Sequence, residues 1–227
     1  MVALENSDVL GTPRPLRRVQ FSLVAFIAAA CCLLALITFA MHNFDENGLR
    51  LGSQMAWRFT FFVFFAALIA GPLGRLLPFG PLEYLGECRR QLLWGFCASF
   101  AVYLATLLVP NMVRPLSAAH DGLTFGMAAF AVFSAVLTAI IAFGISGYAG
   151  ALLGAAARRA MLIVGLGYFW LAYAMSGLAH ITGPHRPDAF YGISLSLMVT
   201  ALLLRFADRF VQNWKRREPE PAGVLAL

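Results

Sequence analysis

The residues best suited to bind a metal ion or a haem iron are the four histidines, His42, His120, His180 and His185. All four lie near the ends of apolar runs, and in the topology argued below they fall on the same, outer side of a membrane. Imidazole binds haem iron, copper and zinc alike. One interpretation is therefore a metal or haem site at the outer rim, with His180 as the central ligand and His120 or His185 as its partner.

Two other interpretations of the histidines stay open. They could be ordinary loop and interface residues, with His180 capping the end of its helix, or one of them could take part in proton transfer. The four cysteines form no CxxC pair and no metal-ligand spacing, which indicates structural thiols.

The composition predicts an integral membrane protein. Of the 227 residues, 60% are hydrophobic and 12% are charged, whereas a soluble domain is about 45–50% apolar and about 25% charged. The formal charge of +6 does not indicate nucleic-acid binding, because the basic residues separate apolar runs and no basic groove with interleaved aromatics is evident. The lipid bilayer is thus the first expected partner.

The apolar runs predict an all-α bundle of six transmembrane helices. About 20 apolar residues are enough to cross a bilayer. The expected spans are roughly 19–41, 57–77, 89–109, 123–145, 160–180 and 189–211, and together they form one domain over residues 19–211. Residues 1–18 and 212–227 are expected to be a cytoplasmic tail and a disordered cytoplasmic tail.

Basic residues predict the orientation of the bundle. Lys and Arg collect on the cytoplasmic side of a membrane, and all but four of the 17 basic residues fall on one side of the six spans. Both termini are therefore expected in the cytoplasm. The four exceptions are Arg50, Arg58, Arg114 and Arg186.

Several connections are expected to be irregular. Residues 42–56 should form an outer loop, residues 78–87 a short cytoplasmic loop, and Pro110 should end the third span. Gly71 and Pro72 should kink the second span. The small-residue tract 146–159 could extend the fourth span or form an interfacial turn.

Some functional classes are disfavoured by the sequence. No charge is expected deep in a span, which argues against a pump, a channel or a secondary transporter. The sequence contains no P-loop, GxSxG, HExxH or Rossmann fingerprint. Glu83 and Glu87 should pair with Arg89 and Arg90 or remain in water.

Three stretches resemble the ferric reductase-like transmembrane domain, and in particular the haem-binding membrane subunit of the bacterial periplasmic methionine sulfoxide reductase system. They are GPLGRLLPFGPLEYLGECRRQLLWGFCASFAVYL, AFGISGYAGALLGAAARRAM and GYFWLAYAMSGLAHI. The resemblance covers roughly residues 50–210. It implies a multi-pass protein of the bacterial inner membrane.

In that family haem b lies between the third and fifth helices and is ligated by their histidines. Carried over by position, the third-helix ligand falls at Tyr103, the first fifth-helix ligand at Gly167, and the second at His180. Tyrosinate can ligate ferric haem, whereas glycine has no ligand atom. We expect Gly167, like Gly165, to permit a close helix contact.

The resemblance implies a membrane subunit that takes part in electron transfer, at most as one part of an oxidoreductase, with haem b as its cofactor and a redox protein as its partner. The alternative is a haem-less relative that serves as a structural or assembly subunit of another membrane complex. Tyr103, Tyr168, Trp170 and Tyr173 could line a cofactor cavity or could be packing residues.

Overall fold

The computed structural model describes residues 16–43, 46–77, 79–113, 121–182 and 188–215. In these ranges the chain forms seven helices and no strand. The helices are α1 (Leu16–Met41), α2 (Glu46–Leu76), α3 (Gly80–Glu87), α4 (Arg89–Val113), α5 (Asp121–Ile145), α6 (Gly147–Thr182) and α7 (Ala189–Lys215). All except α3 are long and apolar enough to cross a membrane. The predicted all-α bundle of six transmembrane helices is thus confirmed.

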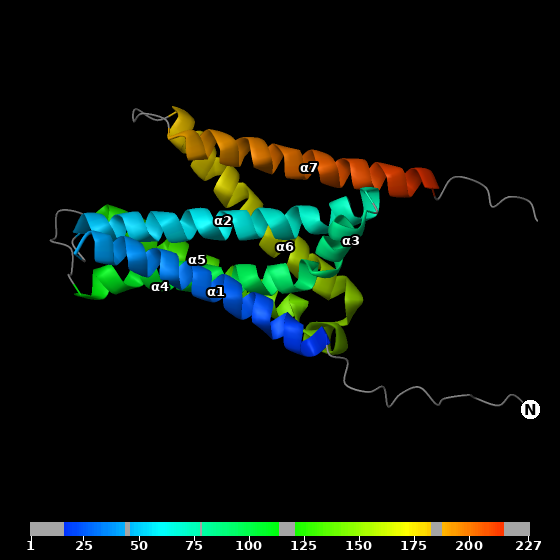
Figure 1. Cartoon of the computed structure of the whole chain (residues 1–227), viewed down its shortest axis with the longest axis horizontal. Coiled ribbons are helices and arrows are strands. Elements are labelled where there is room, and N and C mark those ends of the chain that lie inside the picture. The colour runs from blue at the N-terminus through cyan, green and yellow to red at the C-terminus, as the bar shows by residue number, and fades with distance from the viewer. Residues whose placement is uncertain (1–15, 44–45, 78, 114–120, 183–187, 216–227) are drawn as a thin grey trace, which may run out of the picture.

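The six long helices run back and forth along one direction (Figure 1). The described chain begins and ends at the same end of the bundle, to the right in Figure 1. We call this the basic end, because it carries Arg75, Arg89, Arg159 and Arg209. We call the other end, where α6 meets α7, the His180 end.

Five of the helices pack as a closed ring, in which α2 contacts α4, α4 contacts α5, α5 contacts α6, α6 contacts α7, and α7 returns to α2. Helix α1 lies outside this ring, against α2 and α4. The ring explains why α4 and α6 are not adjacent, although both contribute to the core. Large side chains must fill the space between them.

Aromatic side chains fill that space. Phe169 of α6 lies with its ring centre 5.0 Å from Phe96 and 4.8 Å from Phe100 of α4, and all three residues are fully buried. Tyr173 of α6 continues the cluster toward the His180 end, 4.2 Å from Trp57 of α2. Each such pair contributes about 0.5–1.5 kcal/mol beyond the burial of its area. The interior of the ring is therefore an aromatic core.

A glycine allows α5 and α6 to approach closely. A Cβ atom added to Gly165 would lie 2.4 Å from Cγ1 of Ile141. Gly167 differs, because a Cβ atom there would meet nothing within 4 Å. The prediction of a close helix contact at Gly167 is therefore wrong, and its open surroundings belong to a pocket described below.

Several predicted connections are helical in the structure. Helix α2 begins at Glu46, so most of the outer loop expected at 42–56 is its first three turns. Helix α4 continues through Pro110 to Val113, and α2 contains Pro72. Transmembrane helices tolerate such prolines because neighbouring groups can satisfy the freed backbone. The loop expected at 78–87 contains the short helix α3, which has Pro81 in its first turn.

The small-residue tract 146–159 does not simply extend α5, because it forms the first part of α6 with a turn at Gly154. Gly154 interrupts α6 with a φ of 80°, a left-handed conformation that glycine adopts without steric cost. The residues before it form a short separate helical segment at the basic end. Both predicted tails also overlap with helices, since residues 16–18 belong to α1 and residues 212–215 to α7. The rest of both tails lies outside the described residues.

Candidate functional site

His180 lies in the last turn of α6, exposed, at the His180 end of the bundle. Its Nδ1 lies 2.8 Å from the carbonyl oxygen of Ser176. Its ring stacks on Tyr191 of α7, with centres 3.8 Å apart and an angle of 12° between the planes. A carbonyl oxygen can only accept a hydrogen bond, so Nδ1 carries the proton, and in the neutral ring Nε2 keeps its lone pair. The imidazole thus faces α7 and not α4.

Tyr103 is buried on α4, where its ring lies 5.1 Å from that of Trp57 and 5.4 Å from that of Phe100. It lines a cavity of about 300 Å³ at the His180 end, together with Trp57, Ser176 and Tyr191. His180 does not line this cavity. Tyr191 lines this cavity and also stacks on His180. Tyr103 and His180 therefore lie in the same part of the bundle, but their side chains do not point at a shared centre.

Three further histidines complete the set singled out from the sequence. His120 and His185 lie outside the described residues, and His42 is exposed after the end of α1. Among the residues that the structure describes, no group of three His, Cys, Asp or Glu side chains is arranged to hold a metal ion.

The three family-matched positions do not fit a haem ligated from both α4 and α6. Gly167 has no donor atom, Tyr103 is packed among aromatic rings, and His180 turns toward Tyr191. Phe169 and its two neighbours on α4 occupy the space between the two helices. This donor set supplies one available imidazole and no opposing ligand among the described residues.

The remaining aromatic candidates act mainly in packing. The Tyr168 hydroxyl lies 2.9 Å from Oγ of Ser134, and Nε1 of Trp170 donates to the carbonyl oxygen of Met198 at 3.2 Å. These bonds join α6 to α5 and α7. The hydroxyl of Tyr173 is buried without a hydrogen-bond partner.

The described ranges contain two ion pairs, one at each end of the bundle. Both link α2 to α7, one through a residue of α7 and the other through Asp188, which directly precedes it. At the His180 end, Arg58 binds Asp188, which also accepts a hydrogen bond from the backbone N–H of Phe190 at 3.0 Å. That backbone bond, helped by Arg58, lowers the pKa of the Asp188 carboxyl below its ordinary value. Glu87 is exposed and does not pair with Arg89 or Arg90.

At the basic end, Arg75 binds Asp208 through two contacts, Nε to Oδ1 at 3.1 Å and a terminal nitrogen to Oδ2 at 2.5 Å. Gln212 donates a further hydrogen bond to the same carboxylate at 2.9 Å. The Asp208 side chain is only 7% exposed. An acidic side chain of the predicted span 189–211 is thus buried between two helices, close to the end of α7.

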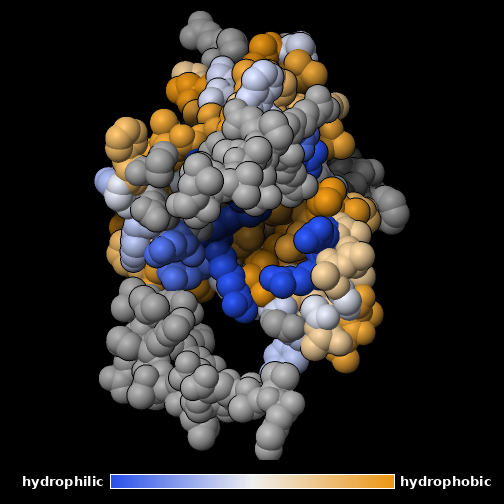
Figure 2. Space-filling view, turned by 90° about the vertical axis from the view of Figure 1, so that its right-hand side faces the viewer, coloured by the Kyte–Doolittle hydropathy of each residue, from blue (hydrophilic) through white to orange (hydrophobic). Residues whose placement is uncertain are grey.

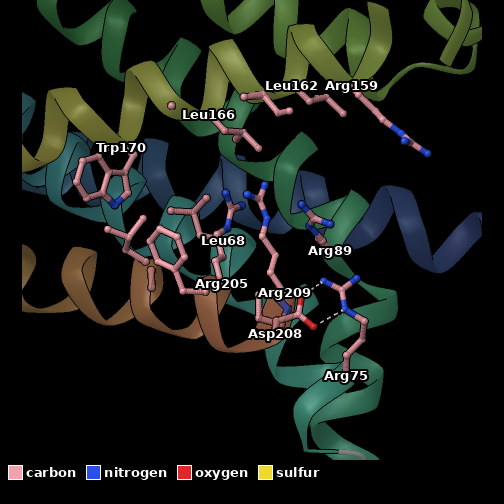
Figure 3. Close-up of a pocket in the computed structure, with 16 residues that line it drawn as sticks. Leu68, Arg75, Arg89, Arg159, Leu162, Leu166, Trp170, Arg205, Asp208 and Arg209 are labelled. Carbon is pink, nitrogen blue, oxygen red and sulfur yellow. Dashed lines mark hydrogen bonds and ion pairs between the residues drawn. The ribbon is translucent and has the colours of Figure 1, made fainter. Parts of the chain in front are cut away.

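A pocket of about 550 Å³ opens beside this ion pair, between α2, α4, α6 and α7 (Figure 3). Figure 2 views the basic end and shows a hollow with hydrophilic side chains at its rim and hydrophobic ones inside. The arginines that line it are Arg75, Arg89, Arg159, Arg205 and Arg209. Gly167 lies in its wall.

By their places in the sequence, these arginines indicate the orientation of the chain in the membrane. Three of the pocket residues also carry a more specific signal, since Arg205, Asp208 and Arg209 are spaced i, i+3 and i+4 and so share one face of a helix. Charged residues on one face inside a predicted span indicate a protein-facing site.

No family model, no curated protein and no solved structure matches this chain.

Proposed function

We propose that this chain is a haem-less membrane subunit of the ferric reductase-like class that serves as a structural or assembly partner of another membrane protein. The observation that carries the proposal is the contact of Phe169 with Phe96 and Phe100, which fills the space between α4 and α6, where the resemblance would put haem b. Because aromatic side chains fill the space between α4 and α6, the outer surface of the bundle is the part available to a protein partner.

Absorption spectroscopy tests this proposal. We expect the detergent-purified protein to show no b-type haem band after dithionite reduction and no stoichiometric iron, also when cells are supplied with a haem precursor. A related haem-binding membrane protein, purified in the same way, serves as the positive control. A stoichiometric b-type band would contradict the haem-less function.

The assembly role needs its own measurement. We expect the protein, extracted in a mild detergent from its native membrane, to migrate as one defined complex with a fixed stoichiometry to a second membrane protein. Deletion of this chain should lower the amount of that second protein. Migration as a monomer, with no change in any other membrane protein upon deletion, would contradict the role.

A second candidate is transmembrane electron transfer through haem b bound at the His180 end. The hydrogen bond from Nδ1 of His180 to the Ser176 carbonyl favours it, because metal-ligating histidines are commonly held in this way. His180 would be one ligand and His120 or His185 the other, with Tyr103 flanking the group. If this second candidate is correct, the wild-type protein shows the b-type haem absorption band after dithionite reduction, and the His180→Ala variant does not.

We further propose that the chain lies in a bacterial inner membrane with both termini in the cytoplasm. The excess of arginine at the basic end, where the described chain both begins and ends, supports this orientation. A reporter enzyme active only in the periplasm should be inactive when fused after Trp214. The same reporter inserted at Asp45, Asp121 or Arg186 should be active, and the reverse pattern would contradict the orientation.

A further inference from the structure

We propose that the pocket at the basic end binds the phosphate-bearing headgroup of an anionic membrane lipid, with its acyl chains lying along the apolar wall between α6 and α7. This inference does not depend on the function proposed above. It rests on the charge of the pocket, on one unsatisfied arginine, and on the apolar wall behind the arginines.

The pocket has a large excess of positive charge. Five guanidinium groups line it, whereas Asp208 provides its one carboxylate among the described residues. Arg75 and Gln212 already bind that carboxylate. Figure 3 shows Arg75, Arg89 and Arg209 gathered near Asp208, with Arg159 across the pocket on α6. Four unbalanced positive charges in one hollow favour binding of a multivalent anion.

Arg89 gives the most direct indication of an anion. Its Nε is buried and has no hydrogen-bond partner, and a buried charged donor without a partner is costly. Arg89 is also the first residue of α4, where the helix dipole disfavours a positive charge. An anion in the pocket would satisfy the donor and offset both effects.

The inner wall of the pocket is apolar. Leu68 and Leu166 are buried in its wall, and Trp170 lies further toward the core. Ile163 of α6 and Phe206 of α7 also line it and are 66% and 60% exposed. The lining thus continues onto the surface that faces the hydrocarbon. A small hydrophilic anion would leave these walls in water, whereas a lipid would cover them.

The position of the pocket also suits a lipid headgroup. It lies where α2 ends, where α4 begins and close to the end of α7, and hence at the level of the membrane interface. Basic pockets between transmembrane helices are known to bind anionic headgroups. Arginine binds phosphate in a bidentate manner, so several arginines can hold one phosphate in a fixed position.

The test compares two variants of the full-length protein. Arg205→Gln/Arg209→Gln removes two charges from the pocket without touching Arg75 or Asp208. Arg90→Gln is the control, because Arg90 lies at the same end, next to Arg89, but is exposed and does not line the pocket. Delipidated protein is titrated with phosphatidylglycerol, phosphatidylcholine or inorganic phosphate, and binding is measured by native mass spectrometry and by thermal stability.

We expect the wild type and Arg90→Gln to bind phosphatidylglycerol with the same affinity and to bind phosphatidylcholine much more weakly. The double variant should bind phosphatidylglycerol roughly tenfold or more weakly, as expected when charge-assisted hydrogen bonds are lost. Inorganic phosphate should neither bind measurably nor raise the unfolding temperature.

Three results would overturn the proposal. The two lipids could bind equally, the control could lose as much affinity as the double variant, or inorganic phosphate could bind as well as the lipid. The last result would assign the pocket to a soluble phosphate compound instead. If the double variant does not fold, Arg159→Gln replaces it, since Arg159 lines the pocket from α6 and contributes to neither ion pair.

Discussion

Replacing Gly165 with leucine is expected to destabilise the bundle strongly at the contact between α5 and α6. Even the Cβ atom of the new side chain would lie 2.4 Å from Cγ1 and 3.0 Å from Cδ1 of Ile141 on α5. Ile141 is fully buried and β-branched, so its Cγ1 cannot easily move aside. Overpacking of this kind costs about 1–3 kcal/mol, and separating α5 from α6 loses the close packing that holds transmembrane helices together. The free energy of unfolding in detergent should fall by at least that amount.

Gly167→Leu is the matched control, two residues along the same helix. A side chain there enters the open pocket and meets nothing within 4 Å at its Cβ. We expect this variant to fold with an unchanged unfolding temperature and a normal monodisperse yield. Because leucine would partly fill the pocket, it should weaken phosphatidylglycerol binding. Equal destabilisation by the two substitutions would contradict the assignment of Gly165 to the helix contact and Gly167 to the pocket.

The number of spans could be predicted because each one is an apolar run of sufficient length. Their ends could not, because polarity and helix formation are separate properties. Residues 46–56 contain Glu46, Asn47 and Arg50, and this polarity predicts a loop. In the structure they form the first turns of α2, before its most apolar part. Pro110 reads as a stop, but it is tolerated within α4.

The candidate site shows a different limit of sequence reasoning. His180 and Tyr103 could be singled out by residue type and spacing, but the direction of a side chain depends on its neighbours. His180 turns to α7 because Tyr191 offers a stacking surface. Tyr103 is held by Trp57, which comes from the part of α2 nearest the expected loop.

The arginine pocket was missed for a related reason. Its charges come from four helices, and the pairing of Arg75 with Asp208 joins residues 133 positions apart. In the sequence Arg75, Arg89 and Arg159 lie near the ends of apolar runs, where topology alone explains them, and only Arg205 and Arg209 fall inside a predicted span. Only the ring arrangement of α2, α4, α6 and α7 brings these arginines to one hollow.

The ion pair in that pocket leads to the second large prediction. Asp208→Asn should lower the free energy of unfolding by about 1.5–3 kcal/mol, the range for hydrogen bonds to charged groups. The substitution keeps the shape of the side chain, which is only 7% exposed, but removes the charge that Arg75 and Gln212 bind. It also leaves the surrounding arginines without a counter-charge. The Arg75 side chain is 53% exposed and can be hydrated, so we do not expect the larger loss seen for fully buried pairs.

Asp188→Asn is the control, because it breaks the pair that joins the same two helices at the other end. The Arg58 and Asp188 side chains are 25% and 44% exposed, and such pairs contribute about 0–1 kcal/mol. Asparagine can still accept the hydrogen bond from the N–H of Phe190. The lowered pKa of Asp188 means that its contribution is complete above the ordinary aspartate pKa and is lost only as the pH falls through the lowered value. At neutral pH Asp188 is therefore compared in its ionised form. Equal losses in the two variants would show that α2 and α7 are not held mainly at the basic end.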